Sequence, residues 1–179
     1  FTLATVRPET KFGDTALAVN PNDKRYKSYV GKEVEAEGLL GKFKIRVIAD
    51  KAVDPKFGTG VVKVTPAHDF NDYDLGQRHR LKTISVMGKD GRITEAGGPY
   101  AGLKFSEARD RVIEGLKASG ELVRVEEHTH WVGLCQRCDQ VAEPMISLQW
   151  FVKIESLAKP AIEAVKDGRI QFFPKSWEK

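Results

Sequence analysis

The sequence predicts an α+β fold that is mainly β, in the form of a barrel-like domain with short flanking helices. Short β-type runs separated by Gly, Pro, Asn and Asp occupy the first half of the chain, whereas helical periodicity appears mainly in the second half. Apolar residues make up 41% of the 179 residues and charged residues 30%, which suits a buried core with a solvated surface. Neither a repeat nor a low-complexity linker divides the chain, so one domain over residues 1–179 is expected.

The β-type segments are short and closely spaced, which is typical of a barrel or a strongly bent sheet. The tail is expected to form a further strand from residue 170, followed by an exit segment that ends at residue 179. In chain order, the strands predicted before this tail are 1–6, 15–20, 32–37, 43–49, 61–65 and 83–87.

Helix signals occur in three places. Apolar residues recur at every fourth position within 106–119, where Ser106 is placed to cap the helix and Gly120 to end it. Residues 157–166 show a second apolar stripe, and a shorter helix is expected over 69–80.

Charge and hydropathy exclude several classes of protein. The 29 Lys and Arg residues exceed the 25 Asp and Glu residues by four, which gives a weak attraction for polyanions. No apolar run reaches 18 residues and the first residues do not form a signal peptide, so we expect a cytoplasmic protein that spans no membrane. The chain lacks an initiator Met and opens on strand-like residues, which suggests a piece of a longer protein.

The two cysteines form a single Cys-x2-Cys pair, Cys135 and Cys138, within an excursion and return segment over about residues 128–155. In a reducing compartment this spacing is typical of half a zinc site, and His128 and His130 lie just upstream. Their spacing does not match a familiar zinc ribbon. The sequence therefore favours a knuckle-like turn with reduced thiols, and a partial zinc site stays open as the alternative.

The first motif that suggests chemistry is Thr-Val-Arg-Pro-Glu-Thr at residues 5–10. Pro8 fixes its own φ and disfavours helical geometry at Arg7, so the chain must turn there. A stiff loop then presents the side chains of Arg7 and Thr10. The alternative is an ordinary turn with a surface arginine.

The second motif is Phe-Gly-Thr-Gly at residues 57–60, which leads into the strand predicted over 61–65. Its glycines allow either a close approach of the backbone to a ligand or a positive φ at a hairpin. Lys63 and Thr65 share one face of the strand because side chains alternate. A solvated lysine is the simpler interpretation of that face.

The third motif contains His68, Asp69 and Asp72. Two carboxylates three residues apart in the first turn of a helix project to the same side, and the helix N-terminus favours their ionised form. This arrangement predicts a negative pocket for an ammonium group or a metal. The alternative is a pair of capping carboxylates beside a packed histidine, and a metal site built from all three residues has awkward geometry.

Together these motifs resemble the editing domain of class I aminoacyl-tRNA synthetases, most closely that of the valyl-tRNA synthetases. Glu at position 9 and the Lys-x-Thr-Pro run at 63–66 set the chain apart from the leucyl and isoleucyl domains, which stay as alternatives. Residues 143–151 and 174–177 resemble the segment that returns to the catalytic domain, whereas the HIGH and KMSKS signatures of aminoacylation are absent. The matching runs are T-x-R-P-E-T at 5–10, G-D-T-A at 13–16, F-G-T-G at 57–60 and K-V-T-P-A-H-D-x-N-D at 63–72.

The resemblance implies proofreading hydrolysis of threonyl-tRNA(Val), with threonyl-adenylate as a second substrate to consider. In valyl-tRNA synthetase a hydrophobic pocket rejects the extra hydroxyl of threonine by only about a hundredfold, so a second, polar site is needed. The implied partners are the 3′ acceptor end of tRNA(Val), the threonine ester and the remaining domains of an ATP-binding parent synthetase. No cofactor is implied for editing.

The resemblance also assigns roles to residues. Asp72 would bind the α-ammonium of the mischarged amino acid, Asp69 with Thr65 or Lys63 would read the hydroxyl and orient the ester, and Arg7 with Thr10 would contact the terminal adenosine. The rivals from other classes are a non-catalytic β-barrel that binds RNA and a zinc-stabilised module. The expected catalytic residues are Asp69, Asp72, Lys63 and Thr65, and the expected substrate-binding residues are Thr5, Arg7, Thr10, Phe57, Gly58, Thr59, Gly60 and His68.

Overall fold

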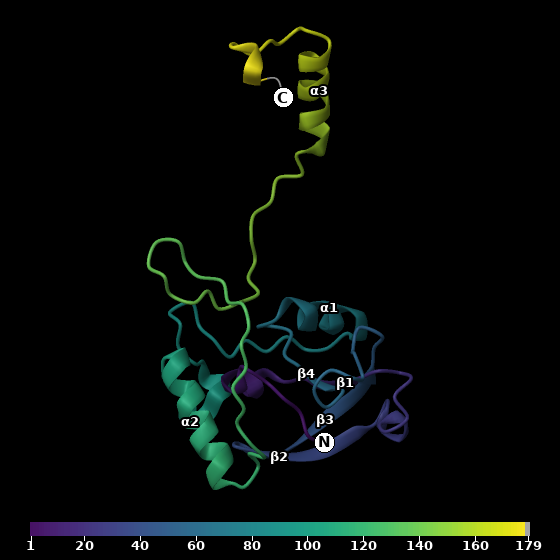
Figure 1. Cartoon of the computed structure of the whole chain (residues 1–179), viewed down its shortest axis with the longest axis vertical. Helices are drawn as coiled ribbons and strands as arrows, with labels where there is room; N and C mark the ends of the chain where they lie inside the picture. Colours follow the sequence, from purple (N-terminus) through teal and green to yellow (C-terminus); the bar gives the residue numbers. More distant parts are fainter. Residues whose placement is uncertain (178–179) are drawn as a thin grey trace. The chain divides into compact units, whose positions relative to one another are not determined.

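The computed structural model describes residues 1–177. The chain divides into two compact units, Phe1–Ile146 and Ser147–Lys179, and each is described by itself. Among the described residues, the first unit holds the sheet and two α-helices, and the second holds one α-helix (Figure 1). The expected single domain over 1–179 stays a prediction, because a separate compact unit does not establish independent folding.

A four-stranded mixed sheet forms the centre of the first unit, with the strand order β2-β3-β1-β4. The pair β1 and β3 is parallel, and the other two pairs are antiparallel. The α+β class is confirmed, and the sheet is open, since its two outer strands are β2 and β4. The strands are β1 (Ala16–Val19), β2 (Glu33–Gly38), β3 (Gly41–Ala49) and β4 (Val61–Val64), all within or beside predicted strands.

The hairpin of β2 and β3 follows from its charge pattern and its turn. Glu35 lies opposite Lys44, and two further glutamates of β2 face Lys42 and Arg46 in the same register. Opposite charges in facing positions stabilise an antiparallel pair. Gly41 has φ +97° at the turn, a conformation that favours glycine.

Both faces of β1 are covered, which explains why its four residues are buried. Ala16 and Ala18 pack on one face against Leu75 of α1. Leu17 and Val19 pack on the other face with residues of β3 and β4. A third apolar cluster lies beneath α2. The sheet is therefore a rigid support for the side chains of β4 at its edge.

The first unit contains α1 (Phe70–His79) and α2 (Phe105–Ala118), and the second contains α3 (Glu155–Lys166). All three lie where helices are predicted. Asp69 caps α1, because its Oδ1 accepts hydrogen bonds from the N–H groups of Asn71 and Asp72 at 2.8 and 3.1 Å. The short 3-10 helices are η1 (Pro8–Gly13), η2 (Lys27–Tyr29), η3 (Glu95–Tyr100) and η4 (Lys175–Trp177).

The predicted cap of α2 is wrong. The helix begins at Phe105, one residue before Ser106, and its N-cap residue Lys104 makes no side-chain hydrogen bond to the helix. Burial of Phe105 and Ala108 in the third cluster fixes this start instead of a cap. Gly120 has φ +77° just after the helix, as its predicted role at the end requires.

Three predicted strands are also wrong within the described residues. Residues 1–6 form no ladder, and Phe1 stacks on Tyr26 with 5.6 Å between ring centroids. In the segment 83–87 only Met87 makes a β-bridge, because the N–H of Val86 donates to a side chain instead. Residues 170–177 contain a 3-10 helix and no strand. The remainder of that predicted tail, 178–179, lies outside the described residues.

Candidate functional site

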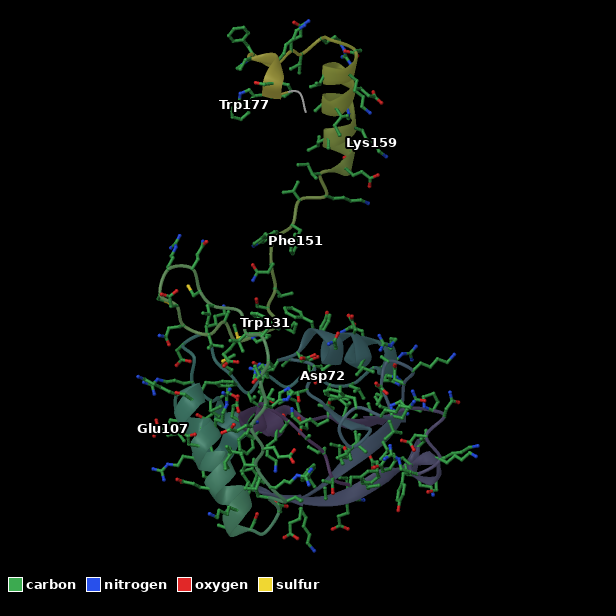
Figure 2. All side chains as sticks on the ribbon, in the orientation of Figure 1. Asp72, Glu107, Trp131, Phe151, Lys159 and Trp177 are labelled. Atoms are coloured by element: carbon green, nitrogen blue, oxygen red, sulfur yellow. The ribbon has the colours of Figure 1, made fainter. Side chains whose placement is uncertain are left out.

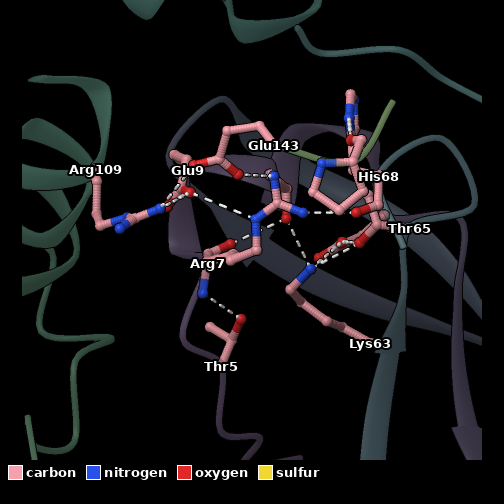
Figure 3. A network of polar contacts seen from close by, with 11 residues as sticks. Thr5, Arg7, Glu9, Lys63, Thr65, His68, Arg109 and Glu143 are labelled. Carbon is pink, nitrogen blue, oxygen red and sulfur yellow. Dashed lines mark hydrogen bonds and ion pairs between the residues drawn. The ribbon is translucent and has the colours of Figure 1, made fainter. Parts of the chain in front are cut away.

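Lys63 lies at the centre of a mostly buried group of polar side chains, the polar cluster, which consists of Thr10, Asp14, Lys63 and Thr65. The Lys63 ammonium donates to Thr10 Oγ1 at 3.0 Å, to Asp14 Oδ1 at 3.2 Å and to Thr65 Oγ1 at 2.7 Å. An ammonium has three N–H donors, so all of them are used. The predicted shared face of Lys63 and Thr65 is confirmed by their contact (Figure 3).

Asp14 is the acceptor that completes the polar cluster. Its Oδ1 accepts from Thr65 Oγ1 at 2.6 Å as well as from Lys63. Burial raises the pKa of the Asp14 carboxyl above its ordinary value of 3.8, whereas Lys63 and the Thr65 hydroxyl act in the opposite direction. The ionised form of Asp14 therefore depends on these two partners.

Asp69 and Asp72 lie in different environments at the start of α1. Asp69 is exposed and its side chain caps the helix. Asp72, labelled in Figure 2, is buried, and its Oδ2 accepts from the Thr65 N–H at 2.8 Å. Burial, with a smaller contribution from the Asp69 carboxylate, raises the pKa of Asp72 to about 6, although the Thr65 hydrogen bond and Lys63 act in the opposite direction. Thr65 thus joins Asp72 to the polar cluster.

Arg7 is held by a network of ion pairs (Figure 3). It donates to the main-chain oxygen of His68 and to Glu143 Oε2, both at 2.6 Å. The fully buried Glu9 accepts two hydrogen bonds from Arg109, at 2.9 and 2.6 Å, and Arg109 also lies 3.7 Å from Glu143. The Arg7 Nε is buried without a hydrogen-bond partner among the described residues. Glu143 and the His68 main-chain oxygen therefore hold the Arg7 guanidinium in place, and Arg109 links Glu143 to Glu9.

The backbone turn around Arg7 positions the Arg7 side chain in this network. Pro8 opens η1, where its fixed φ suits the first helical position. Thr10 Oγ1 donates to the Arg7 main-chain oxygen at 2.9 Å, and Thr5 Oγ1 accepts from the Arg7 N–H at 3.1 Å. The Arg7 side chain is only 20% exposed. The alternative of an ordinary surface arginine is therefore wrong, and Thr5 and Thr10 lie on either side of Arg7 as the motif predicts.

His68 uses both ring nitrogens within the fold. Its Nε2 accepts from the Val86 N–H at 2.9 Å, so Nδ1 carries the proton and faces the Pro144 main-chain oxygen at 3.3 Å. Burial lowers the pKa of His68, which favours this neutral form. Neither nitrogen is free for a substrate in this conformation. We therefore interpret His68 as a residue that links Val86 and Pro144, and its predicted substrate contact stays a prediction.

The Phe57 to Gly60 loop lies just before β4. Gly58 and Gly60 have φ +56° and +77°, and a Cβ at Gly60 would lie 2.9 Å from a main-chain oxygen, so glycine is required there. The main-chain oxygen of Thr59 accepts from the Tyr26 hydroxyl at 3.3 Å. Phe57 is 74% exposed and leaves its ring available for stacking. The adenosine contacts predicted for this loop stay predictions.

Sequence reasoning did not select four residues that shape this site. Asp14 belongs to the G-D-T-A run, and its place just before a strand that pairs with β4 was the available signal. Glu9 was likewise within a quoted motif. Arg109 and Glu143 are far from Arg7 along the chain, and no local pattern points to them.

The Cys135 and Cys138 thiols lie in a tight hairpin and are free. The N–H groups of Arg137 and Cys138 hydrogen-bond to the Cys135 sulfur and lower the pKa of that thiol. The rings of His128 and His130 stack on each other at 5.7 Å. Over the described part of the chain, no group of three or more His, Cys, Asp or Glu side chains is arranged to hold a metal. Zinc at this hairpin stays a prediction.

Comparison with known proteins places this site in context. No family model matches the chain. The valine–tRNA ligase of Thermotoga maritima is 55% identical over 177 residues, and that of Clostridium acetobutylicum is 54% identical; each match covers 99% of this chain and 20% of the relative. The chain matches a segment of valine–tRNA ligase. A further ligase, from Clostridium tetani, is 52% identical over the same shares.

The chain spans about a fifth of the length of these relatives. The resemblance to the valyl-tRNA synthetases is confirmed, and the matches support it over the leucyl and isoleucyl alternatives. None of the helices over residues 1–177 is long and apolar enough to cross a bilayer.

The geometry limits the chemistry that this site can perform. A buried carboxylate, Asp72, adjoins a cluster whose lysine donors are already used, so the remaining free groups are mainly acceptors. Such a site suits a small ligand with an ammonium and a hydroxyl, both of which are donors. Both ring nitrogens of His68 are engaged, so this histidine is not placed as a free base beside a nucleophile.

Proposed function

We propose that this chain hydrolyses threonyl-tRNA(Val) and thereby acts as the proofreading deacylase of a valine–tRNA ligase. The observation that carries the proposal is the contact of Asp72 with Thr65, which joins a buried carboxylate to the polar cluster. The match to a segment of valine–tRNA ligases supports the same function, because that enzyme must separate threonine from valine.

In this proposal Asp72 binds the α-ammonium of the esterified amino acid. Only its Oδ2 is engaged by the Thr65 N–H, which leaves the other oxygen as an acceptor. The exposed carboxylate of Asp69 adds negative charge at the same helix start. A buried carboxylate with a cationic ligand makes a stronger ion pair than an exposed one, so the ammonium is a suitable anchor.

The polar cluster reads the hydroxyl of threonine. Valine presents a methyl group at that position, and its binding would leave a buried polar group without a partner. The single hydroxyl proton of threonine satisfies one buried acceptor. An unsatisfied buried group costs about 1–3 kcal/mol, so its absence in valine gives a discrimination of about 5- to 150-fold. Lys63 and Thr65 therefore act in specificity and in orienting the ester.

The terminal adenosine of tRNA(Val) lies against Arg7 and the Phe57 to Gly60 loop in this account. Arg7 supplies fixed positive charge, since its guanidinium is held on two sides by hydrogen bonds. Phe57 supplies an exposed ring on which a base can stack. The remaining domains of the ligase, in the cytoplasm, would hold most of the tRNA.

The chemical step is hydrolysis of an ester. A water oxygen bonds to the carbonyl carbon, the bond from that carbon to the ribose oxygen breaks, and a proton from water ends on the ribose hydroxyl. His68 has no free nitrogen, so the step relies on positioning of ester and water rather than on this residue as a base. Threonyl-adenylate is a second substrate that fits the same amino-acid contacts.

Deacylation by the wild type and by Asp72→Ala tests the proposal. We expect the variant to release threonine from threonyl-tRNA(Val) at least about a hundredfold more slowly, because a charge-assisted contact of roughly 3 kcal/mol is lost. Asp50→Ala is the matched control, since its side chain is 11% exposed and pairs with Arg78 outside the site. Equal threonine release by wild type and Asp72→Ala would remove the proposed role of Asp72.

A non-catalytic RNA-binding module is the rival function. It predicts binding of tRNA with no threonine release above the uncatalysed rate. The same deacylation assay therefore separates the two functions.

A further inference from the structure

We propose that Asp14 is a positioning residue that makes the polar cluster selective for a hydroxyl donor. The inference rests on the proposed function, since it concerns how that site distinguishes threonine from valine. Within the described residues the Asp14 side chain hydrogen-bonds to Lys63 and Thr65, and to no residue of α1 or of the Phe57 to Gly60 loop.

A count of donors and acceptors carries the argument. A threonine hydroxyl has one proton and two acceptor positions. Thr65 gives its proton to Asp14 and accepts from Lys63, so one acceptor position is left. Thr10 gives its proton to the main-chain oxygen of Arg7 and also accepts from Lys63, so it too has one acceptor position left.

Lys63 has no proton left to donate, because its three N–H groups bind Thr10, Asp14 and Thr65. Every group that the polar cluster can still offer a ligand is therefore an acceptor. A ligand hydroxyl supplies one matching donor, whereas a methyl group at the same place supplies none and leaves the acceptor that the hydroxyl would bind buried and unpaired.

Asp14 determines the direction in which the Thr65 hydroxyl donates its proton. Without its carboxylate the Thr65 proton has no fixed acceptor, and the hydroxyl can rotate and present its own proton to the ligand site. Lys63 likewise regains one free N–H. The polar cluster then offers both donors and acceptors, and it no longer demands a donor from the ligand.

Burial makes this control effective. The side chains of Asp14 and Lys63 are 12% and 11% exposed, and Thr10 and Thr65 are almost fully buried. Water has little access to replace a missing partner, so the orientation of each hydroxyl is decided by its protein neighbours.

The test is the ratio of deacylation rates for threonyl-tRNA(Val) and valyl-tRNA(Val), measured for the full 179-residue chain and its variants. Asp14→Ala should lower this ratio by about tenfold, which corresponds to one lost hydrogen-bond discrimination. Asp14→Asn keeps an acceptor oxygen for Thr65 and Lys63, so its ratio should stay within about threefold of the wild type. Asp50→Ala, whose carboxylate is buried to a similar degree, should keep the wild-type ratio.

A double-mutant cycle shows whether Asp14 acts through Thr65. Thr65→Val removes the hydroxyl at nearly constant volume and should itself lower the ratio. In the Thr65→Val background, Asp14→Ala should change the ratio by less than about twofold, because residues that act as one unit are not additive. Where Asp14→Ala fails to fold cooperatively, Thr65→Val alone decides, and a wild-type ratio in that variant overturns the inference.

The outcomes separate this inference from the proposed function. No threonine release by the wild type overturns the proposed function and the role of Asp14 with it. Threonine release by the wild type, with an unchanged ratio in Asp14→Ala, overturns only the role of Asp14. The role of Asp14 is also overturned if Asp50→Ala lowers the ratio of deacylation rates as much as Asp14→Ala does. It is overturned likewise if Asp14→Asn is as unselective as Asp14→Ala.

Discussion

Asp72→Asn should stabilise the chain in a way that depends on pH. The fold raises the pKa of Asp72 from its ordinary 3.8 to about 6, so its ionised form is disfavoured in the folded state. A pKa difference of about two corresponds to about 3 kcal/mol at most. The protonated form carries no such penalty, so the cost is nearly absent below about pH 4, grows between about pH 4 and pH 6, and levels off above that pH. The carboxylate therefore lowers stability at neutral pH.

The assay is urea unfolding of wild type and Asp72→Asn at intervals from pH 4 to pH 7.5. The difference in the free energy of unfolding should move in favour of the variant by about 2 kcal/mol across this range, because most of the ionisation of Asp72 occurs within it. Asp50→Asn is the control. Arg78 holds the pKa of Asp50 at about 2, so the difference for that variant should change far less over the same pH range and in the opposite direction. Parallel stability curves for wild type and Asp72→Asn would refute the reasoning.

Three further predictions concern the pH profile of activity, the ion-pair network around Arg7 and the Phe57 to Gly60 loop. Background-corrected kcat/KM for threonine release should fall as pH drops through about 6, since protonated Asp72 no longer attracts an ammonium, and a flat profile would count against that contact. Arg109→Met should lower the free energy of unfolding by about 2–3 kcal/mol, because the buried Glu9 loses both hydrogen bonds from Arg109 and keeps only a 3.9 Å ion pair with Arg7. The exposed Arg111→Met should change it by less than about 0.5 kcal/mol, and equal effects would exclude the network as a structural element. Gly60→Ala should be less stable in urea than Gly31→Ala by about 1 kcal/mol or more. Both glycines have positive φ, but only at Gly60 do backbone and side-chain atoms lie where the Cβ would be. Equal losses of stability would show that the contacts of this Cβ have no cost.

The sequence predicted those secondary-structure elements that depend on neighbouring residues alone. The four strands of the sheet and all three α-helices follow from apolar alternation and periodicity, and the Asp69 cap follows from residue type and position. The segments 1–6 and 83–87 also look like strands, but strand formation requires a partner strand with free backbone groups. In 83–87 the Val86 N–H is taken by His68, a contact that no local pattern shows.

The residues of the candidate site likewise divide into those that local motifs predict and those that require the three-dimensional fold. The motifs selected Lys63, Thr65 and Asp72, which the fold brings into contact through β4 and the start of α1. Burial of Asp72, and with it a pKa of about 6, depends on the packing of α1 on the sheet and was not predicted. The pairing of Arg109 with Glu9 joins residues one hundred positions apart and requires the three-dimensional fold.

We propose that this chain removes threonine from tRNA(Val) and spares valine. Deacylation of radiolabelled threonyl-tRNA(Val) and valyl-tRNA(Val) by the 179-residue chain, each corrected for uncatalysed hydrolysis, tests it most directly. We expect threonine release to be faster than valine release by about tenfold or more, because valine leaves one buried acceptor without a donor. Equal release of both amino acids, or no release above the uncatalysed rate, would contradict it.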